Sequence, residues 1–140
     1  MSNPTGVIAR NIRIPWSIAL LAILFVGAGA LHFIIPRPYE GLVPTWLPNS
    51  PIVVRLSGVV ELLGGVGILI PVTRPAAGRG LILLLIAVFP ANVEMLRLAH
   101  AASASGLWQV GLWLRLPLQV ALIWWVWRAA AGGSAVRRAA

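Results

Sequence analysis

Cysteine is absent from the 140-residue chain, and acidic residues are nearly so, with three Asp or Glu in total. Without cysteine, the side chains cannot form a disulfide, exchange thiols or hold an iron–sulfur cluster. Charged residues make up only 10% of the chain and hydrophobic residues 59%, whereas soluble domains carry about 25% charged residues. The composition therefore excludes an ordinary soluble domain and predicts an integral membrane protein.

Lysine is also absent, so all 11 basic residues are arginine and the formal net charge is +8. A charge of this sign could indicate nucleic-acid binding. The arginines, however, are spread over the ends of apolar segments, and no basic face interleaved with exposed aromatic residues is evident. We expect no nucleic-acid partner.

Long apolar segments are present at residues 15–35, 52–70, 78–99 and 107–127. Each is long enough to cross about 30 Å of hydrocarbon as a helix. We expect an all-α integral membrane protein, built as an antiparallel four-transmembrane-helix bundle over residues 15–128. Residues 1–14 would form a cytoplasmic N-terminal segment, and residues 129–140 a flexible cytoplasmic tail.

The arginines also predict the orientation of these helices. They cluster before the first segment, in the turn between the second and third, and after the fourth, at positions 10, 13, 74, 79, 128, 137 and 138. By the positive-inside rule, both chain ends and this turn are cytoplasmic. Ala28-Gly29-Ala30 imitates a signal-peptide cleavage site, but apolar sequence continues to Ile35, which favours a retained helix.

Prolines lie between the apolar segments and at two positions inside them. The proline-rich stretch 36–51 opposes a regular helix, and we expect an outer loop whose Tyr39 and Trp46 lie at headgroup level. This loop could be an interfacial belt or a lid over a site. Pro90 and Pro117 fall inside the third and fourth segments, where each removes a backbone hydrogen bond and predicts a bend.

Glu61 is the most informative single residue, because it sits in the middle of an apolar run. An ionisable side chain at mid-bilayer costs roughly 2.5 to 3.5 kcal/mol, so its presence indicates a function or a partner. Arg115 is the expected partner. At about 100° per residue, Glu61 shares a helix face with small residues that favour close helix packing, namely Ser57, Gly58, Gly64 and Gly65.

Helical phase and depth predict a cluster around this acid. Arg115 and Gln119 are four residues apart, so both project from one face of the last helix. A rise of 1.5 Å per residue puts them at about the level of Glu61, with Asn92 nearby on the third helix and His32 towards the outer surface. The expected polar cluster comprises His32, Glu61, Asn92, Arg115 and Gln119.

Two interpretations of the cluster stay open. A buried ion pair with amide support could simply fix helix packing. Alternatively, a small polar pocket opening outwards could let Arg115 donate hydrogen bonds to a quinone carbonyl or an anion, while Glu61 exchanges protons and His32 relays them. No catalytic residue is identified, and no metal site is expected; a haem held by His32 and His100 is disfavoured.

Four blocks of the sequence resemble the DoxX or DoxX-like membrane proteins. They are GALHFIIPRPYEGLVPTWLP, SGVVELLGGVGILIPVTRPAAGRG, LILLLIAVFPANVEM and WLRLPLQVALIWWVWR, in this order over about residues 27–128. The resemblance implies a multi-pass protein of the bacterial inner membrane. The family's motif positions fall on His32, Pro36, Tyr39, Pro44, Leu47, Pro48, Ser57, Glu61, Asn92, Arg115, Pro117 and Gln119.

The resemblance also implies a function, because some relatives are linked to thiosulfate oxidation with quinone as acceptor or to membrane-associated oxidoreductase complexes. We therefore expect a non-autonomous subunit of a redox complex that binds quinone or a small sulfur species. The expected partners are the lipid bilayer and either redox subunits or further copies of the chain. The alternatives are a structural or assembly protein and, with less support, a small-solute transporter, since no inverted repeat or broken helix pair is seen.

The topology can be checked with reporter fusions. We expect a phosphatase fused after Trp46 to be active on the outer face, and the same reporter fused after Arg128 to be inactive, because the arginines hold both ends in the cytoplasm. A reporter that is cytoplasmic after Trp46 would overturn the orientation.

Overall fold

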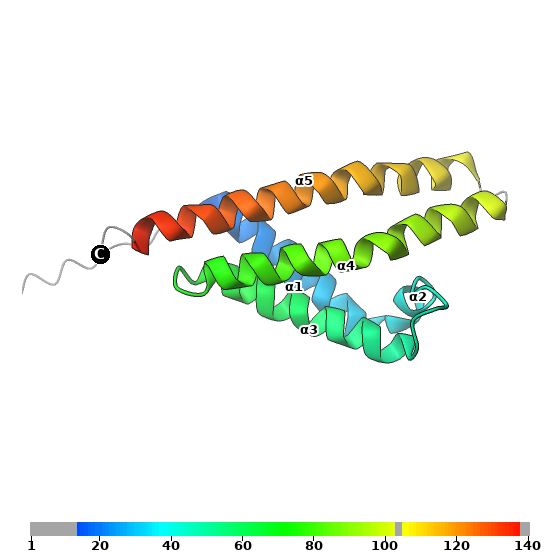
Figure 1. Cartoon of the computed structure of the whole chain (residues 1–140), viewed down its shortest axis with the longest axis horizontal. Helices are drawn as coiled ribbons and strands as arrows, with labels where there is room; N and C mark the ends of the chain where they lie inside the picture. Colours follow the sequence, from blue (N-terminus) through cyan, green and yellow to red (C-terminus); the bar gives the residue numbers. More distant parts are fainter. Residues whose placement is uncertain (1–13, 103–104, 138–140) are drawn as a thin grey trace, which may run out of the picture.

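The computed structural model describes residues 14–102 and 105–137, with side chains described up to residue 131. Over these residues the protein is all helical and contains no strand. Its helices are α1 (Trp16–Ile34), α2 (Pro36–Glu40), α3 (Ser50–Leu69), α4 (Arg74–Ala101) and α5 (Gly106–Arg137). Figure 1 shows the four long helices running lengthwise, with α2 at one end beside the start of α3.

The four long helices are each long and apolar enough to cross a membrane. This finding agrees with the four segments expected from the sequence, although the ends differ. α4 begins at Arg74 rather than near residue 78, because Pro75 is well tolerated in a first helical turn. α5 extends to Arg137, well past the expected end at residue 127 and into the segment for which a flexible tail was predicted. Residues 1–13, including Arg10 and Arg13, lie outside the described residues.

The loop after α1 corrects a second expectation, since its prolines do not prevent a helix. Pro36 and Pro38 lie in the first turn of α2, where the backbone N–H groups have no helical partner to lose. Beyond α2, residues 41–49 form turns, and Asn49 adopts a left-handed conformation with φ 57° immediately before α3. Asparagine is one of the few residues that tolerate this region.

The helices pack as two pairs. α1 packs most extensively on α3, α4 packs on α5, and a smaller contact between α3 and α4 joins the pairs. The pairs meet closely at the end that holds the α3–α4 turn, around a buried cluster of Ile18, Leu21, Ala22, Phe25, Ile68, Leu81 and Val126. Towards α2 they diverge (Figure 1). A second, smaller cluster of Met95, Ala99 and Leu112 holds α4 on α5 there.

Glycine allows α1 and α3 to approach closely. A Cβ atom built on Gly29 would lie 2.8 Å from the carbonyl oxygen of Gly58, and one built on Gly58 would lie 2.8 Å from Cβ of His32. Lower on α3, Gly65 meets Val26 of α1, and Gly64 meets Leu81 of α4. The glycines at positions 58, 64 and 65 therefore lie at helix contacts, as their shared face indicated.

The tight turn between α3 and α4 is held by Arg74 and Thr73. The buried Arg74 guanidinium donates from Nε to the carbonyl of Ile68 (2.7 Å) and from Nη2 to that of Leu69 (3.2 Å), and the Thr73 hydroxyl donates to the Gly67 carbonyl (2.7 Å). These are carbonyls of the last helical turn, which have no partner within the helix. Arg74, interpreted from the sequence as an orientation signal, thus also closes the end of α3.

A pair of alanine substitutions on α1 tests the close helix contact. We expect Gly29→Ala to lower the free energy of unfolding by about 1 to 3 kcal/mol, because the new methyl group meets backbone atoms of α3 that cannot move aside. Gly27→Ala is the matched control, since nothing lies within 4 Å of its Cβ position. Thermal unfolding in detergent, followed by circular dichroism, should show Gly27→Ala at or above the native midpoint; equal midpoints for both variants would contradict the contact.

Candidate functional site

A cavity of about 250 Å³ lies where the two helix pairs diverge, next to α2 and the loop that follows it. Every helix contributes to its wall. The polar and aromatic side chains that line it are His32, Tyr39, Trp46, Ser57, Glu61, Asn92 and Arg115. The remainder of the wall is apolar and comes from Ala28, Leu42, Val43, Pro44, Leu47, Val53, Val54, Ala87, Val88, Pro90 and Ala91.

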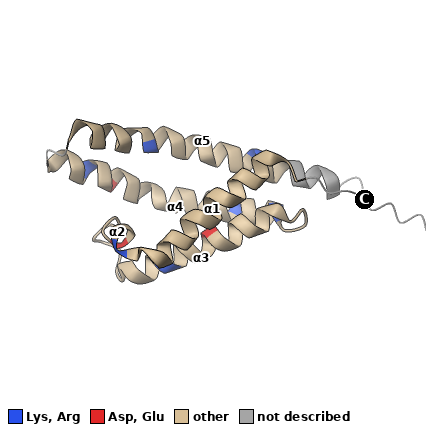
Figure 2. Ribbon diagram, turned by 180° about the vertical axis from the view of Figure 1, so that it is seen from behind, with Lys and Arg blue, Asp and Glu red and all other residues tan. Residues whose placement is uncertain are grey.

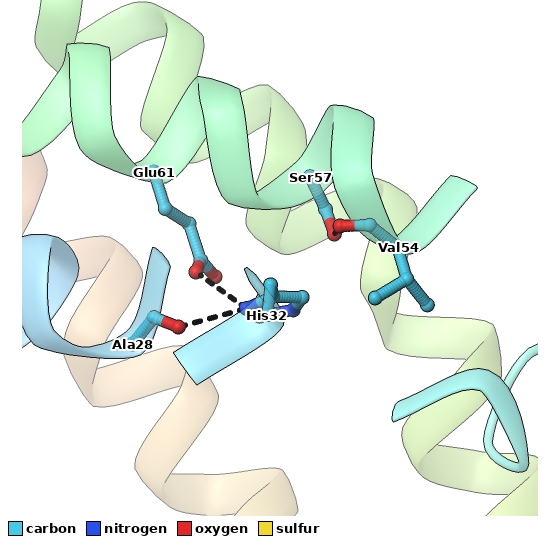
Figure 3. Close-up of polar contacts among 5 residues, drawn as sticks. All are labelled: Ala28, His32, Val54, Ser57 and Glu61. Atoms are coloured by element: carbon cyan, nitrogen blue, oxygen red, sulfur yellow. Dashed lines mark hydrogen bonds and ion pairs between the residues drawn. The ribbon is translucent and has the colours of Figure 1, made fainter. Parts of the chain in front are cut away.

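Glu61 faces α1 from the middle of α3, and its neighbour is His32. The carboxylate oxygen Oε2 of Glu61 lies 3.3 Å from Nδ1 of His32, and both side chains are largely buried (Figure 3). The close approach of α1 and α3 at Gly29 and Gly58 brings these two side chains together. The acid and the imidazole therefore form one unit on the α1–α3 side of the cavity.

The His32 ring is held on two sides. Nδ1 lies 2.8 Å from the carbonyl oxygen of Ala28 in the preceding turn, and because a carbonyl can only accept, Nδ1 is the nitrogen that carries the proton. The ring also stacks on Tyr39 of α2, with centroids 4.1 Å apart and planes inclined by 26°. Tyr39 was expected in an outer loop or lid, and the structure places it as a cover on the histidine.

One carboxylate oxygen of Glu61 accepts no hydrogen bond from the described residues. This oxygen, Oε2, is buried, and it accepts no bond from these residues because the Nδ1 proton of His32 is directed to the shorter contact with Ala28. Buried polar atoms in proteins are almost always hydrogen-bonded, so an exception in a cavity wall indicates a place where a bound molecule donates a hydrogen bond.

Arg115 lines the same cavity from α5 but does not pair with Glu61. Its side chain donates to the sulfur of Met95 at 3.5 Å, and the ion pairs among the described residues join Glu61 to His32 and Glu94 to Arg97. The expected pairing of Glu61 with Arg115 is therefore wrong. The physical reason is the divergence of the helix pairs, which puts the acid and the guanidinium in different walls of the cavity.

Gln119 and Asn92 also depart from the expected single cluster, because they bond chiefly to one another. The Asn92 amide donates to Oε1 of Gln119 (2.9 Å), and Gln119 Nε2 donates to the backbone carbonyl of Leu85 (2.5 Å). The next carbonyl along the chain, that of Ile86, lacks its usual helical donor because Pro90 has no backbone N–H. A neighbouring side chain that bonds to the backbone beside an internal proline is how apolar helices tolerate one. Gln119 is buried and is not part of the cavity wall, whereas Asn92 is.

The other expected site residues have simpler positions. The Ser57 hydroxyl donates to the Val54 carbonyl of its own helix (2.8 Å) while lining the cavity. Trp46 also lines the cavity although 69% of its surface is exposed. No group of three or more potential metal ligands occurs within the described residues.

Sequence reasoning missed the apolar part of the wall that comes from the loop. Leu42, Val43, Pro44 and Leu47 close the cavity next to α2, and nothing in a short proline-rich stretch shows where it folds. The available signal was the concentration of prolines, which indicates a rigid loop with little conformational entropy to lose.

Comparison with known proteins places the chain in a family. Residues 21–130 match the sequence model of the family described as Domain of unknown function (DUF8561). The chain belongs to this family. The matched range includes every polar residue of the cavity wall. No curated protein and no solved structure matches the chain.

A double-mutant cycle can separate the Asn92–Gln119 contact from the cavity wall. Gln119→Leu leaves the Asn92 amide and the Leu85 carbonyl without a side-chain partner, and we expect it to cost about 1 to 3 kcal/mol of unfolding free energy. Because the same contact is lost, adding Asn92→Leu should cost less than the sum of the single changes. Arg115→Met is the control on the same helix and should change stability little. Additive losses at positions 92 and 119 would refute the contact.

Proposed function

We propose that the protein is an antiparallel four-transmembrane-helix bundle in a bacterial inner membrane, with both chain ends cytoplasmic. Three observations support this placement: four helices of sufficient length and hydropathy, extensive exposed apolar surface on all of them, and the position of Arg74, Arg79 and Arg128 at an end of the described helices that carries no acidic residue. Trp16, Trp124 and Trp127 are exposed near that end, where tryptophan favours a membrane interface.

Within this placement, we propose that the cavity binds the head group of a quinone. The observation that carries the proposal is that Glu61 and Arg115 line one cavity without pairing with each other. An acid and a guanidinium kept only for packing should neutralise one another, since unpaired charges in an apolar medium are strongly unfavourable. Oε2 of Glu61 lacks a hydrogen bond although His32 lies beside it, and Arg115 has no acidic partner among the described residues, so the cavity offers an acceptor and a donor to a bound molecule.

The shape and lining favour a quinone ring over a small sulfur oxyanion. A volume of about 250 Å³ is slightly below the roughly 300 to 1,000 Å³ of pockets that hold drug-sized ligands, so the cavity fits a head group and not a complete long-chain lipid. Most of its wall is apolar, which suits a neutral planar ring. The same wall would disfavour a hydrated anion, whose desolvation is costly.

Each polar residue of the cavity would then have a separate role. Arg115 can donate hydrogen bonds to one oxygen of the ring, and in the reduced quinol a hydroxyl can donate to the unsatisfied Oε2 of Glu61. His32, fixed by Ala28 and Tyr39, can pass a proton to or from that carboxylate. Quinone reduction takes up two protons and two electrons; this chain would bind the ring and handle protons, while a partner subunit would supply the electrons.

This role makes the protein a non-autonomous subunit of a membrane-associated redox complex. The resemblance of four sequence blocks to the DoxX proteins supports it, whereas the family that the chain matches is described without a function. The second candidate is a structural or assembly protein. It is favoured by the hydrogen bonds from Gln119 to Asn92 and Leu85, which stabilise helix packing without facing a ligand.

Quinone binding can be tested on purified protein. We expect Arg115→Leu and Glu61→Gln each to reduce bound quinol about tenfold or more, because Arg115→Leu loses the charged donor to a quinol oxygen and Glu61→Gln loses the charged acceptor of a quinol hydroxyl, with unchanged thermal midpoints. Bound quinol is measured by chromatography of solvent extracts and by quenching of tryptophan fluorescence, which should be weaker in Trp46→Phe because Trp46 lines the cavity.

Arg97→Leu serves as the matched control, because Arg97 is an exposed arginine of the same half of the protein and is paired with Glu94. It should retain quinol at the native level. If Arg115→Leu and Glu61→Gln also retain quinol, the proposed ligand is wrong. If both variants lose quinol only together with a fall in thermal midpoint, the structural candidate is favoured.

A further inference from the structure

We infer that a second cavity, at the opposite end of the helices, binds the phosphate of an anionic phospholipid. This cavity has a volume of about 430 Å³ and lies between the start of α1, the start of α4 and the last described turns of α5. Two arginines line it, Arg74 and Arg128, together with Ser17, Ile18, Trp124 and Trp125. It shares no residue with the cavity around Glu61.

The first argument is the absence of any acid at this end. The only side-chain carboxylates in the sequence are Glu40, Glu61 and Glu94, and Figure 2 shows acidic residues on α2, α3 and α4 only. Glu61 lies against His32 and Glu94 against Arg97, while Glu40 is in α2 at the far end. Neither Arg74 nor Arg128 has a carboxylate partner in the described structure.

Because Arg74 is buried, the lack of a counter-ion is unfavourable for its charge. Only 9% of its surface is exposed, and its hydrogen-bond partners, the carbonyls of Ile68 and Leu69, are neutral. A buried charge normally requires an ion of opposite sign. The guanidinium has five N–H donors in a planar fork, and two of its nitrogens bond to those carbonyls, so donors remain for a further acceptor. A phosphate group supplies both the opposite charge and the hydrogen-bond acceptors, because arginine binds it through parallel hydrogen bonds.

Arg128 and the tryptophans indicate where the phosphate comes from. The Arg128 guanidinium carbon lies 5.1 Å from the Trp124 ring centroid, an arrangement that holds the charge over an amphipathic ring. Trp124 and the neighbouring Trp127 are exposed, and Trp124 also lines the cavity. A phospholipid fits both the arginines and the tryptophans, because its phosphate can bind the arginines while an acyl chain lies along the tryptophans. Basic pockets between transmembrane helices bind such lipids.

The inference rests on the proposed membrane placement but not on the ligand proposed for the cavity around Glu61. It concerns the full chain in a bilayer, so we test it in nanodiscs made from equal amounts of phosphatidylglycerol and phosphatidylcholine. The protein is then transferred to mild detergent, and the lipids that remain bound are identified by native mass spectrometry. We expect native protein to retain phosphatidylglycerol in preference to phosphatidylcholine.

Two variants alter the cavity differently. Arg128→Gln removes one charge, and Ser17→Leu fills the space without changing any charge. Each should lower retained phosphatidylglycerol about fivefold. Arg79→Gln is the matched control, since Arg79 lies on the same end of α4, donates to the Pro75 carbonyl and does not line the cavity. It should retain the native amount.

Several outcomes would overturn the inference. They are equal retention of the two lipids by native protein, native retention in both Arg128→Gln and Ser17→Leu, or an equal loss in Arg79→Gln, which would indicate a diffuse charge effect. Displacement of phosphatidylglycerol by millimolar inorganic phosphate would show a site for free anions instead. Failure of the membrane placement itself would be seen separately, as a topology reporter after Trp46 that stays cytoplasmic.

Discussion

The close contact between the backbones of α1 and α3 is the constraint on which the rest of the structure depends. Gly29 and Gly58 let the two helices approach until a single methyl group would not fit between them. This approach places His32 of α1 on Glu61 of α3. It also makes α1 and α3 one unit, so that α4 and α5 form a second unit which meets the first chiefly through α3. A cavity opens where the two units diverge.

Polar groups inside this apolar protein fall into two kinds. Gln119 and Arg74 are buried and bonded to backbone carbonyls, Gln119 beside Pro90 and Arg74 at the end of α3. Both supply a donor near a point where a helix lacks one. Glu61 and Arg115 have no backbone partner of this kind among the described residues, since Oε2 of Glu61 lacks a hydrogen bond although His32 lies beside it and the Arg115 guanidinium donates to the Met95 sulfur. The proposed quinone site is built from the second kind.

The two ends of the molecule differ in charge as well as in shape. All three acids lie in the half with α2, beside four arginines, whereas the end with the α3–α4 turn carries Arg74, Arg79 and Arg128 and no acid among the described residues. Charged groups in an apolar medium lose most of their hydration, so polar or charged binding partners at each end would stabilise them. Within the proposed membrane, the half that holds the acids would receive a neutral ring that exchanges protons, and the end that has arginines but no acid would receive lipid phosphates. Both proposals thus follow from one uneven distribution of charge.

Hydropathy and helical period in the sequence determined the four long helices, the face of α3 that carries Gly58, Glu61, Gly64 and Gly65, and the presence of a polar site near Glu61, because these properties depend on neighbours along the chain. Tertiary structure decided the partners. His32 contacts Glu61 and Arg115 does not, since depth and phase do not determine how far apart two helix pairs diverge. The short helix α2 and the loop wall of the cavity were decided in the same way, through contacts between different helices, such as Tyr39 of α2 with His32 of α1, that no local pattern encodes.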